Sequence, residues 1–254
     1  MLFSMADSAA SLPGGQFAAS RPKGRALLEL GVAYGLILAV IWTPRPWQKA
    51  LWWIAAAAVL AITAISFEGL TAMGLRGRNF FPSLWVAGAA LAAAGVALAV
   101  AARLHKLHPP ASPLRFIATY WAYALWAMVQ QFLLQCFFLA RLRRIVAGEF
   151  KPAAAAAGIF AAAHLPNPIL TPITLLWGMG ACMVFLRYRN LYPLGIAHAI
   201  LGISIALTVP GNLDHNMRVG LSYINYSPKP TPVAHPASFK PPSPLQQPSA
   251  LPQP

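Results

Sequence analysis

The feature that most constrains this chain is a succession of apolar stretches, each about as long as a lipid bilayer is thick. A helix needs about 20 mainly apolar residues to cross roughly 30 Å of hydrocarbon. The stretches that meet or approach this length run over residues 26–43, 47–65, 84–102, 116–140, 153–165, 170–186 and 192–209. The sequence therefore predicts an all-α fold, a polytopic transmembrane bundle of about seven helices.

The charge composition agrees with a membrane setting. Charged residues make up only 9% of the 254 residues, against about 25% in soluble domains. The net charge of +14 would suggest nucleic acid as a partner in a soluble protein. Here the basic residues mostly lie in short clusters between apolar runs, as they do around membrane spans. We therefore predict an integral membrane protein, expected in the bacterial inner membrane, with lipid and not nucleic acid as its surroundings.

Changes in composition divide the chain into parts. We expect a polar N-terminal lead at 1–25, the first three spans at 26–115 and spans with polar residues at 116–210, followed by a proline-rich tail at 227–254. The tail consists largely of Pro, Ser, Gln and Lys, so it cannot bury enough apolar surface to fold and is predicted to be disordered.

Polar side chains inside the predicted spans mark the candidate functional positions, because such groups are costly in lipid. They are Gln130, Gln131, Gln135, His164, Asn167 and His198. Gln131 and Gln135 are four residues apart and share a helix face. The amides can serve as hydrogen-bonding glue between helices, or they can share a polar cavity with the two histidines. Both interpretations stay open at this point.

Metal and redox chemistry are not indicated by the sequence. His164 and His198 lack a carboxylate or thiolate partner at zinc-ligand spacing. Cys136 and Cys182 lie inside apolar runs and match neither a metal-binding nor a redox motif. We therefore expect no metal and no other cofactor.

Three short motifs follow one another on separate predicted spans. They read Gln130-Gln131-Phe-Leu-Leu-Gln135, Phe160-Ala-Ala-Ala-His164 and His198-Ala-Ile-Leu-Gly202. Their order, over about residues 121–209, resembles the CPBP family, which is also called the ABI family. It comprises type II CAAX prenyl endopeptidases and bacteriocin-processing or immunity proteins. Its members carry a Glu-Glu-xxx-Arg motif, a Phe-xxx-His motif and a His-xxx-Asn-type motif in the same order.

The resemblance implies an intramembrane endopeptidase that cleaves a peptide or protein substrate, including lipidated ones. By position, His164 would activate water and His198 would stabilise the oxyanion. Gln130 stands where the family has its general-base glutamate. The resemblance also implies supporting positions at Gln131, Gln135, Phe160 and Asn167.

The departures from the family motifs leave more than one function open. All charges of the opening motif are lost, and Gly202 replaces the final Asn. A neutral amide cannot act as a general base, and the loss of such a base typically costs about 10²–10⁴-fold in rate. One hypothesis is therefore an endopeptidase with a modified base. The alternative is a catalytically degraded member that acts as a membrane binding or scaffold protein. An unrelated channel, transporter or assembly factor is a third class.

Overall fold

The computed structural model describes residues 22–227, and every regular element in this range is a helix. The predicted all-α fold is thus confirmed. Apart from Ser227, the predicted proline-rich tail lies outside the described residues, as do residues 1–21 of the predicted N-terminal lead. The first helix begins at Lys23 instead of residue 26, because Pro22 precedes a helical turn that includes the basic residues Lys23 and Arg25.

The prediction of about seven apolar helices is confirmed as well. Five helical segments are long and apolar enough to cross a membrane. They are α1 (Lys23–Trp42), α2 (Trp47–Ile65), α3 with α4 (Phe80–Ser83 and Trp85–Arg103), the segment Pro113–Ile145, and α8 (Leu170–Tyr188). Two shorter apolar helices, α7 (Phe150–Ala162) and α9 (Tyr192–Thr208), complete the set.

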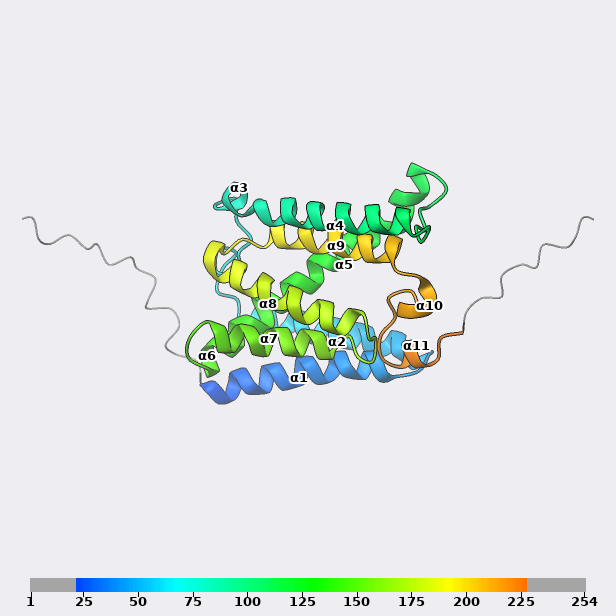
Figure 1. Cartoon of the computed structure of the whole chain (residues 1–254). Helices are drawn as coiled ribbons and strands as arrows, with labels where there is room; N and C mark the ends of the chain where they lie inside the picture. The colour runs from blue at the N-terminus through cyan, green and yellow to red at the C-terminus, as the bar shows by residue number, and fades with distance from the viewer. Residues whose placement is uncertain (1–21, 228–254) are drawn as a thin grey trace, which may run out of the picture.

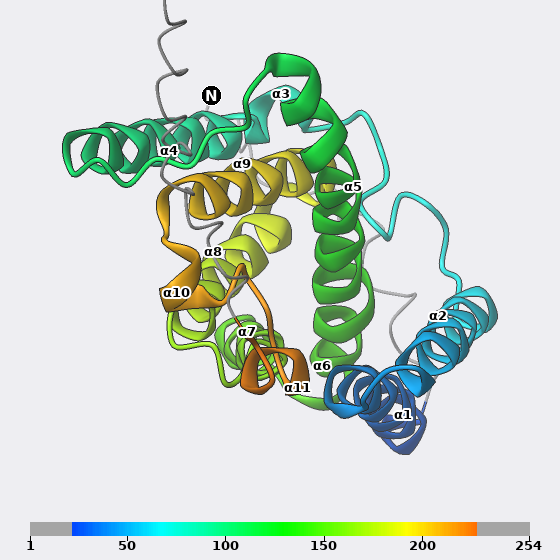
Figure 2. The same cartoon turned by 90° about the vertical axis from the view of Figure 1, so that its right-hand side faces the viewer.

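Figure 1 shows α1, α7, α8, α9 and α4 side by side and roughly parallel or antiparallel, whereas α5 (Pro113–Phe132) passes behind them at a steep angle. The short helices α10 (Gly211–Asp214) and α11 (Leu221–Ile224) lie at the opposite end from α3 and α6 (Ala140–Ile145). Figure 2 shows the pair α1 and α2 nearly end-on at one side of the molecule, with α5 running lengthwise from the α4 and α9 side toward them. This pair is joined to the remaining helices through contacts of α1 with α6 and α11.

The fourth predicted span differs from a simple helix. Residues 113–145 form α5 (Pro113–Phe132), a π-helical segment η1 (Leu133–Leu139) and α6. The π-helical segment was not predicted from the sequence; such segments are rare and often occur at functional sites. All side chains from Leu134 to Leu139 are buried, so η1 crosses the interior of the bundle with Gln135 enclosed.

Small residues allow close approach of the helices that carry the polar motifs. A Cβ atom added at Gly178 of α8 would lie 3.2 Å from the Cα atom of Ala157 in α7. A Cβ atom added at Gly195 of α9 would collide with the side chain of Met128 in α5. Close backbone approach through small residues is typical of packed membrane helices, and here it pairs α7 with α8 and α5 with α9.

A buried ion pair ties α1 to α6. Arg141 Nε donates to Glu29 Oε2 at 2.8 Å, and Arg141 Nη2 donates to Ser66 Oγ at 2.7 Å at the end of α2. The second Glu29 oxygen accepts from the more exposed Arg25 Nε at 2.9 Å. The guanidinium of Arg141 also lies 3.6 Å from the centroid of the Phe137 ring. Removing one partner of a buried pair leaves a desolvated charge, which is strongly destabilising.

We predict that Arg141→Met lowers the free energy of unfolding by about 3–5 kcal/mol. Arg25→Met removes the other partner of the same carboxylate, and because Arg25 is solvent-exposed it should cost less than about 1 kcal/mol. Chemical unfolding in detergent micelles measures both values. Equal effects of the two substitutions would show that the buried ion pair does not hold α1 and α6 together.

Candidate functional site

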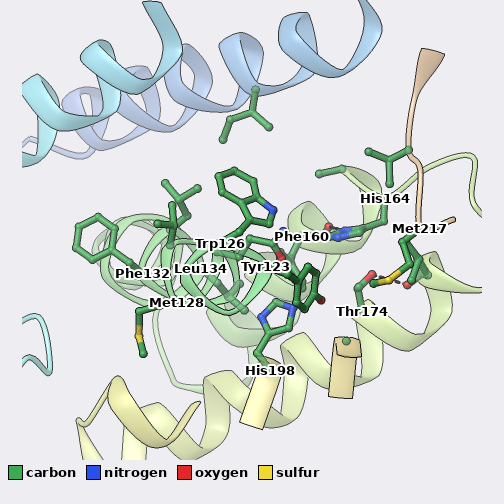
Figure 3. A pocket seen from close by; sticks show the side chains of 18 of the residues that line it. Tyr123, Trp126, Met128, Phe132, Leu134, Phe160, His164, Thr174, His198 and Met217 are labelled. Atoms are coloured by element: carbon green, nitrogen blue, oxygen red, sulfur yellow. Dashed lines mark hydrogen bonds between the residues drawn. The ribbon is translucent and has the colours of Figure 1, made fainter. Parts of the chain in front are cut away.

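A cavity of about 1130 Å³ lies between the pair α1–α2 and helices α5, α7, α8 and α9. Figure 3 shows α1 and α2 across the cavity from His198 on α9, with His164 on another wall. The lining is mostly apolar and includes side chains of Trp, Leu, Ile and Val. Polar groups reach it at only a few places, among them Gln130, His164 and His198. A large apolar pocket with few converging polar groups is the usual form of a binding site.

The structure separates the polar residues of the sequence motifs into a lining set and a buried set. Gln130, Phe160, His164 and His198 line the cavity. Gln131 and Gln135 are fully buried behind the cavity wall. Asn167 is also fully buried, but it lies near the chain segment that follows α9.

Gln131 and Gln135 form a hydrogen-bonded chain that ends on His198. Gln135 Nε2 donates to Gln131 Oε1 at 3.2 Å, and Gln131 Nε2 lies 3.1 Å from His198 Nδ1. With the Gln131 amide in this orientation its nitrogen donates, so we assign His198 Nδ1 as the unprotonated acceptor. The proton of the neutral ring is therefore on Nε2. His198 is a hydrogen-bond donor at the cavity.

His164 has the opposite tautomer. Its Nδ1 atom lies 2.7 Å from the carbonyl oxygen of Phe160. A carbonyl oxygen can only accept, so Nδ1 carries the proton and Nε2 has a free lone pair. The ring centroid of Phe160 lies 4.8 Å from that of His164 and 5.9 Å from that of His198. One aromatic side chain thus positions a proton acceptor and a proton donor at the same cavity.

Asn167 joins the start of α8 to the chain segment that follows α9. Its Nδ2 atom donates to the carbonyl oxygens of Asp214 at 2.8 Å and Arg218 at 3.0 Å. Its Oδ1 atom accepts from the backbone N–H groups of Ile169 and Leu170 at the start of α8. These bonds occupy the amide fully, so Asn167 supports the loop beside the cavity and does not face a ligand.

Two cavity residues were missed by sequence reasoning. Tyr123 lies seven residues before Gln130 in α5, which is two helical turns, so its position on the same face was a usable signal. Asp214 lines the cavity from beyond the last span, where no sequence pattern pointed to it. Its Oδ1 accepts from the backbone N–H of Asn216 at 2.9 Å, and burial raises the pKa of the Asp214 carboxyl.

Within residues 22–227, no carboxylate forms an ion pair with His164 or His198. The same part of the chain contains no group of three His, Cys, Asp or Glu residues arranged to hold a metal ion. Cys136 and Cys182 are both free and buried. The functional groups that the described residues present to the cavity are therefore imidazoles, amides and hydroxyls, together with the carboxyl of Asp214.

Residues 112–203 match the family model described as type II CAAX prenyl endopeptidase Rce1-like. The match extends from the N-cap of α5 into α9 and includes all three motifs. It confirms the resemblance drawn from those motifs. No curated protein and no solved structure was found to match the chain. The match supports a CAAX-protease-like domain at residues 112–203, and the apolar helices support an integral membrane protein.

We predict that Gln131→Glu reverses the tautomer of His198. A carboxylate can only accept, so the proton of His198 should move to Nδ1, leaving Nε2 unprotonated. Nitrogen-15 NMR of histidine-labelled protein distinguishes the two nitrogens by chemical shift. Gln130→Glu is the matched control, because Gln130 has no hydrogen bond to His198 in the described structure. An unchanged His198 spectrum in the Gln131 variant would contradict the assigned hydrogen-bond direction.

Proposed function

We propose that this chain, with its Rce1-like domain, is an endopeptidase that hydrolyses a peptide bond of a lipidated or membrane-embedded substrate. The observation that carries the proposal is a pair of histidines at one cavity whose hydrogen-bond partners assign them opposite tautomers. Hydrolysis needs a group that accepts a proton from water and a donor that stabilises the oxyanion. His164 Nε2 supplies the first and His198 Nε2–H supplies the second.

The proposed reaction begins with water held between His164 and the substrate carbonyl. His164 Nε2 takes one proton as the water oxygen attacks the carbonyl carbon. The carbonyl oxygen becomes an oxyanion and accepts a hydrogen bond from His198 Nε2–H. The tetrahedral intermediate then collapses, the C–N bond breaks, and protonated His164 gives its proton to the leaving amine. The products are a new carboxylic acid and a new amine.

Gln130 has a limited part in this reaction. It lines the cavity, and its amide can hold the attacking water by hydrogen bonds. It cannot accept a proton from that water, so the role of the base falls to His164. We therefore expect a slow enzyme, with a rate about 10²–10⁴-fold below that of a glutamate-containing site.

The cavity suits a substrate with a long apolar group next to its peptide bond. Its volume of about 1130 Å³ exceeds the roughly 300–1,000 Å³ of typical small-molecule pockets. The wall formed by α1 and α2 includes Tyr34, Ile37, Trp52 and Val59. An acyl or prenyl chain would bury its surface against these side chains and leave the peptide near the histidines.

A second candidate function is binding without cleavage. It is favoured by the uncharged chain of Gln135, Gln131 and His198, which links α5 and α9 without any catalytic carboxylate. Such a protein would keep the cavity as a groove for a lipidated peptide or a transmembrane segment. It would then act as a membrane scaffold or binding protein.

We predict that the purified protein, reconstituted in vesicles, cleaves members of a panel of prenylated and transmembrane peptides. His164→Ala should abolish cleavage because it removes the base. His105→Ala is the control, since His105 is exposed in the loop after α4, outside the cavity. Peptide that binds to the wild type but is never cleaved would favour the binding function. Equal cleavage by both variants would contradict the role of His164.

We also predict that Gln130→Glu increases the rate of cleavage by about 10²-fold or more, because it restores a carboxylate that can accept the proton of water. Single-turnover assays with excess enzyme measure the rate of the chemical step. The double variant Gln130→Glu/His164→Ala shows whether the introduced carboxylate can act as the base without His164. An unchanged or lower rate in Gln130→Glu would mean that position 130 is not adjacent to the attacking water.

A further inference from the structure

The Tyr123 side chain fills the space left by the missing side chain at Gly202. Gly202 is one helical turn beyond His198 in α9, so both residues face the same direction. A Cβ atom added at Gly202 would overlap the hydroxyl oxygen, Cζ and Cε1 atoms of Tyr123. The hydroxyl of an α5 residue therefore lies directly against the α9 backbone, next to the turn that carries His198.

The Tyr123 hydroxyl is available to a ligand. Tyr123 and Gly202 both line the cavity, as His198 does. Figure 3 shows Tyr123 and His198 among the side chains that surround it. Among residues 22–227, the hydroxyl forms no hydrogen bond with another residue. A phenol at neutral pH carries its proton and can donate one hydrogen bond.

We propose that Tyr123 is a catalytic residue, the second oxyanion donor of this site beside His198; the role rests on the hydrolysis proposed above. Oxyanion holes commonly use more than one preorganised donor, because charge develops on a single oxygen. Here His198 Nε2–H comes from α9 and the Tyr123 O–H comes from α5. The close packing of α5 on α9 at Met128 and Gly195 fixes the two donors relative to each other.

The two donors act without giving up their protons. As water attacks, the carbonyl oxygen takes the electron pair of the C=O π bond and accepts hydrogen bonds from both groups. When the intermediate collapses, that electron pair re-forms the C=O bond and the hydrogen bonds weaken. The proton that moves in the reaction is still the one carried by His164.

The first test is Tyr123→Phe, which removes only the hydroxyl oxygen. Loss of one oxyanion donor typically lowers kcat by about 10²–10³-fold, and KM should not change because the donor acts mainly on the transition state. Tyr192→Phe is the matched control, since Tyr192 is exposed at the start of α9 and does not line the cavity. A wild-type kcat in Tyr123→Phe, with active wild type, would overturn the role of Tyr123.

A donor swap distinguishes catalysis from packing. Tyr123→Ala alone should lose the donor, and Gly202→Asn alone should lose activity because its side chain collides with Tyr123. The double variant Tyr123→Ala/Gly202→Asn moves an N–H donor onto α9 and should recover kcat to within about 10-fold of wild type. Tyr123→Ala/Gly202→Leu fills the same space without a donor and should stay inactive. Equal activity of the two double variants would assign Tyr123 to packing only.

A measurement that needs no turnover separates this role from the proposed hydrolysis. An S-farnesyl-cysteine peptide with carbon-13 in its scissile carbonyl is bound to each variant and observed by infrared spectroscopy. A carbonyl stretch at lower frequency in the wild type than in Tyr123→Phe supports the donor, even if no cleavage follows and hydrolysis fails. Identical frequencies, or absence of any bound probe, would overturn the donor role. Cleavage with identical frequencies would leave the hydrolysis standing without Tyr123.

Discussion

The site depends on the hydrogen-bonded chain that runs from Gln135 through Gln131 to His198. All three side chains are buried, and in a lipid-surrounded interior an unpaired polar group is expensive. With the amides oriented as they are, the direction of the chain determines which ring nitrogen of His198 carries a proton. A network built for helix association thus also sets the chemistry that α9 presents to the cavity. Gln131 therefore serves both the packing of α5 on α9 and the proposed function of the cavity.

The buried ion pair of this molecule involves none of the residues that line the cavity. The buried pair of Glu29 and Arg141 lies near the end of the bundle where α6 is found, and the exposed Arg25 shares its carboxylate. The lining residues Gln130, His164 and His198 carry no fixed charge and sit among apolar walls. These three residues avoid the cost of a desolvated carboxylate, and among them only imidazole can take a proton from water. The lack of fixed charge at these residues therefore makes the proposed enzyme slow and also lets the cavity accommodate an apolar substrate.

The sequence predicted the helical spans closely, because their length and composition are fixed by the bilayer. The predicted span 47–65 coincides with α2, and the others differ from the observed helices by a few residues at their ends. The motifs also named the residues that meet at the cavity, including Gln130, His164 and His198. Three features were not predictable. The π-helical segment η1 depends on tertiary packing. The role of Asn167 in holding a loop depends on residues 214–218 folding back against it after α9. The approach of Tyr123 to Gly202 depends on how α5 crosses α9.

The central claim is that water, activated without a carboxylate, breaks a peptide bond in this cavity. The most direct measurement is the incorporation of oxygen-18 from labelled water into the carboxyl group of the product, followed by mass spectrometry of a prenylated peptide incubated with the reconstituted protein. We predict one labelled oxygen in the new carboxylate with the wild-type protein and no labelled product with His164→Ala. Peptide that remains bound, intact and unlabelled over many hours in the wild type would contradict hydrolysis and leave a membrane protein that binds its ligand without cleaving it.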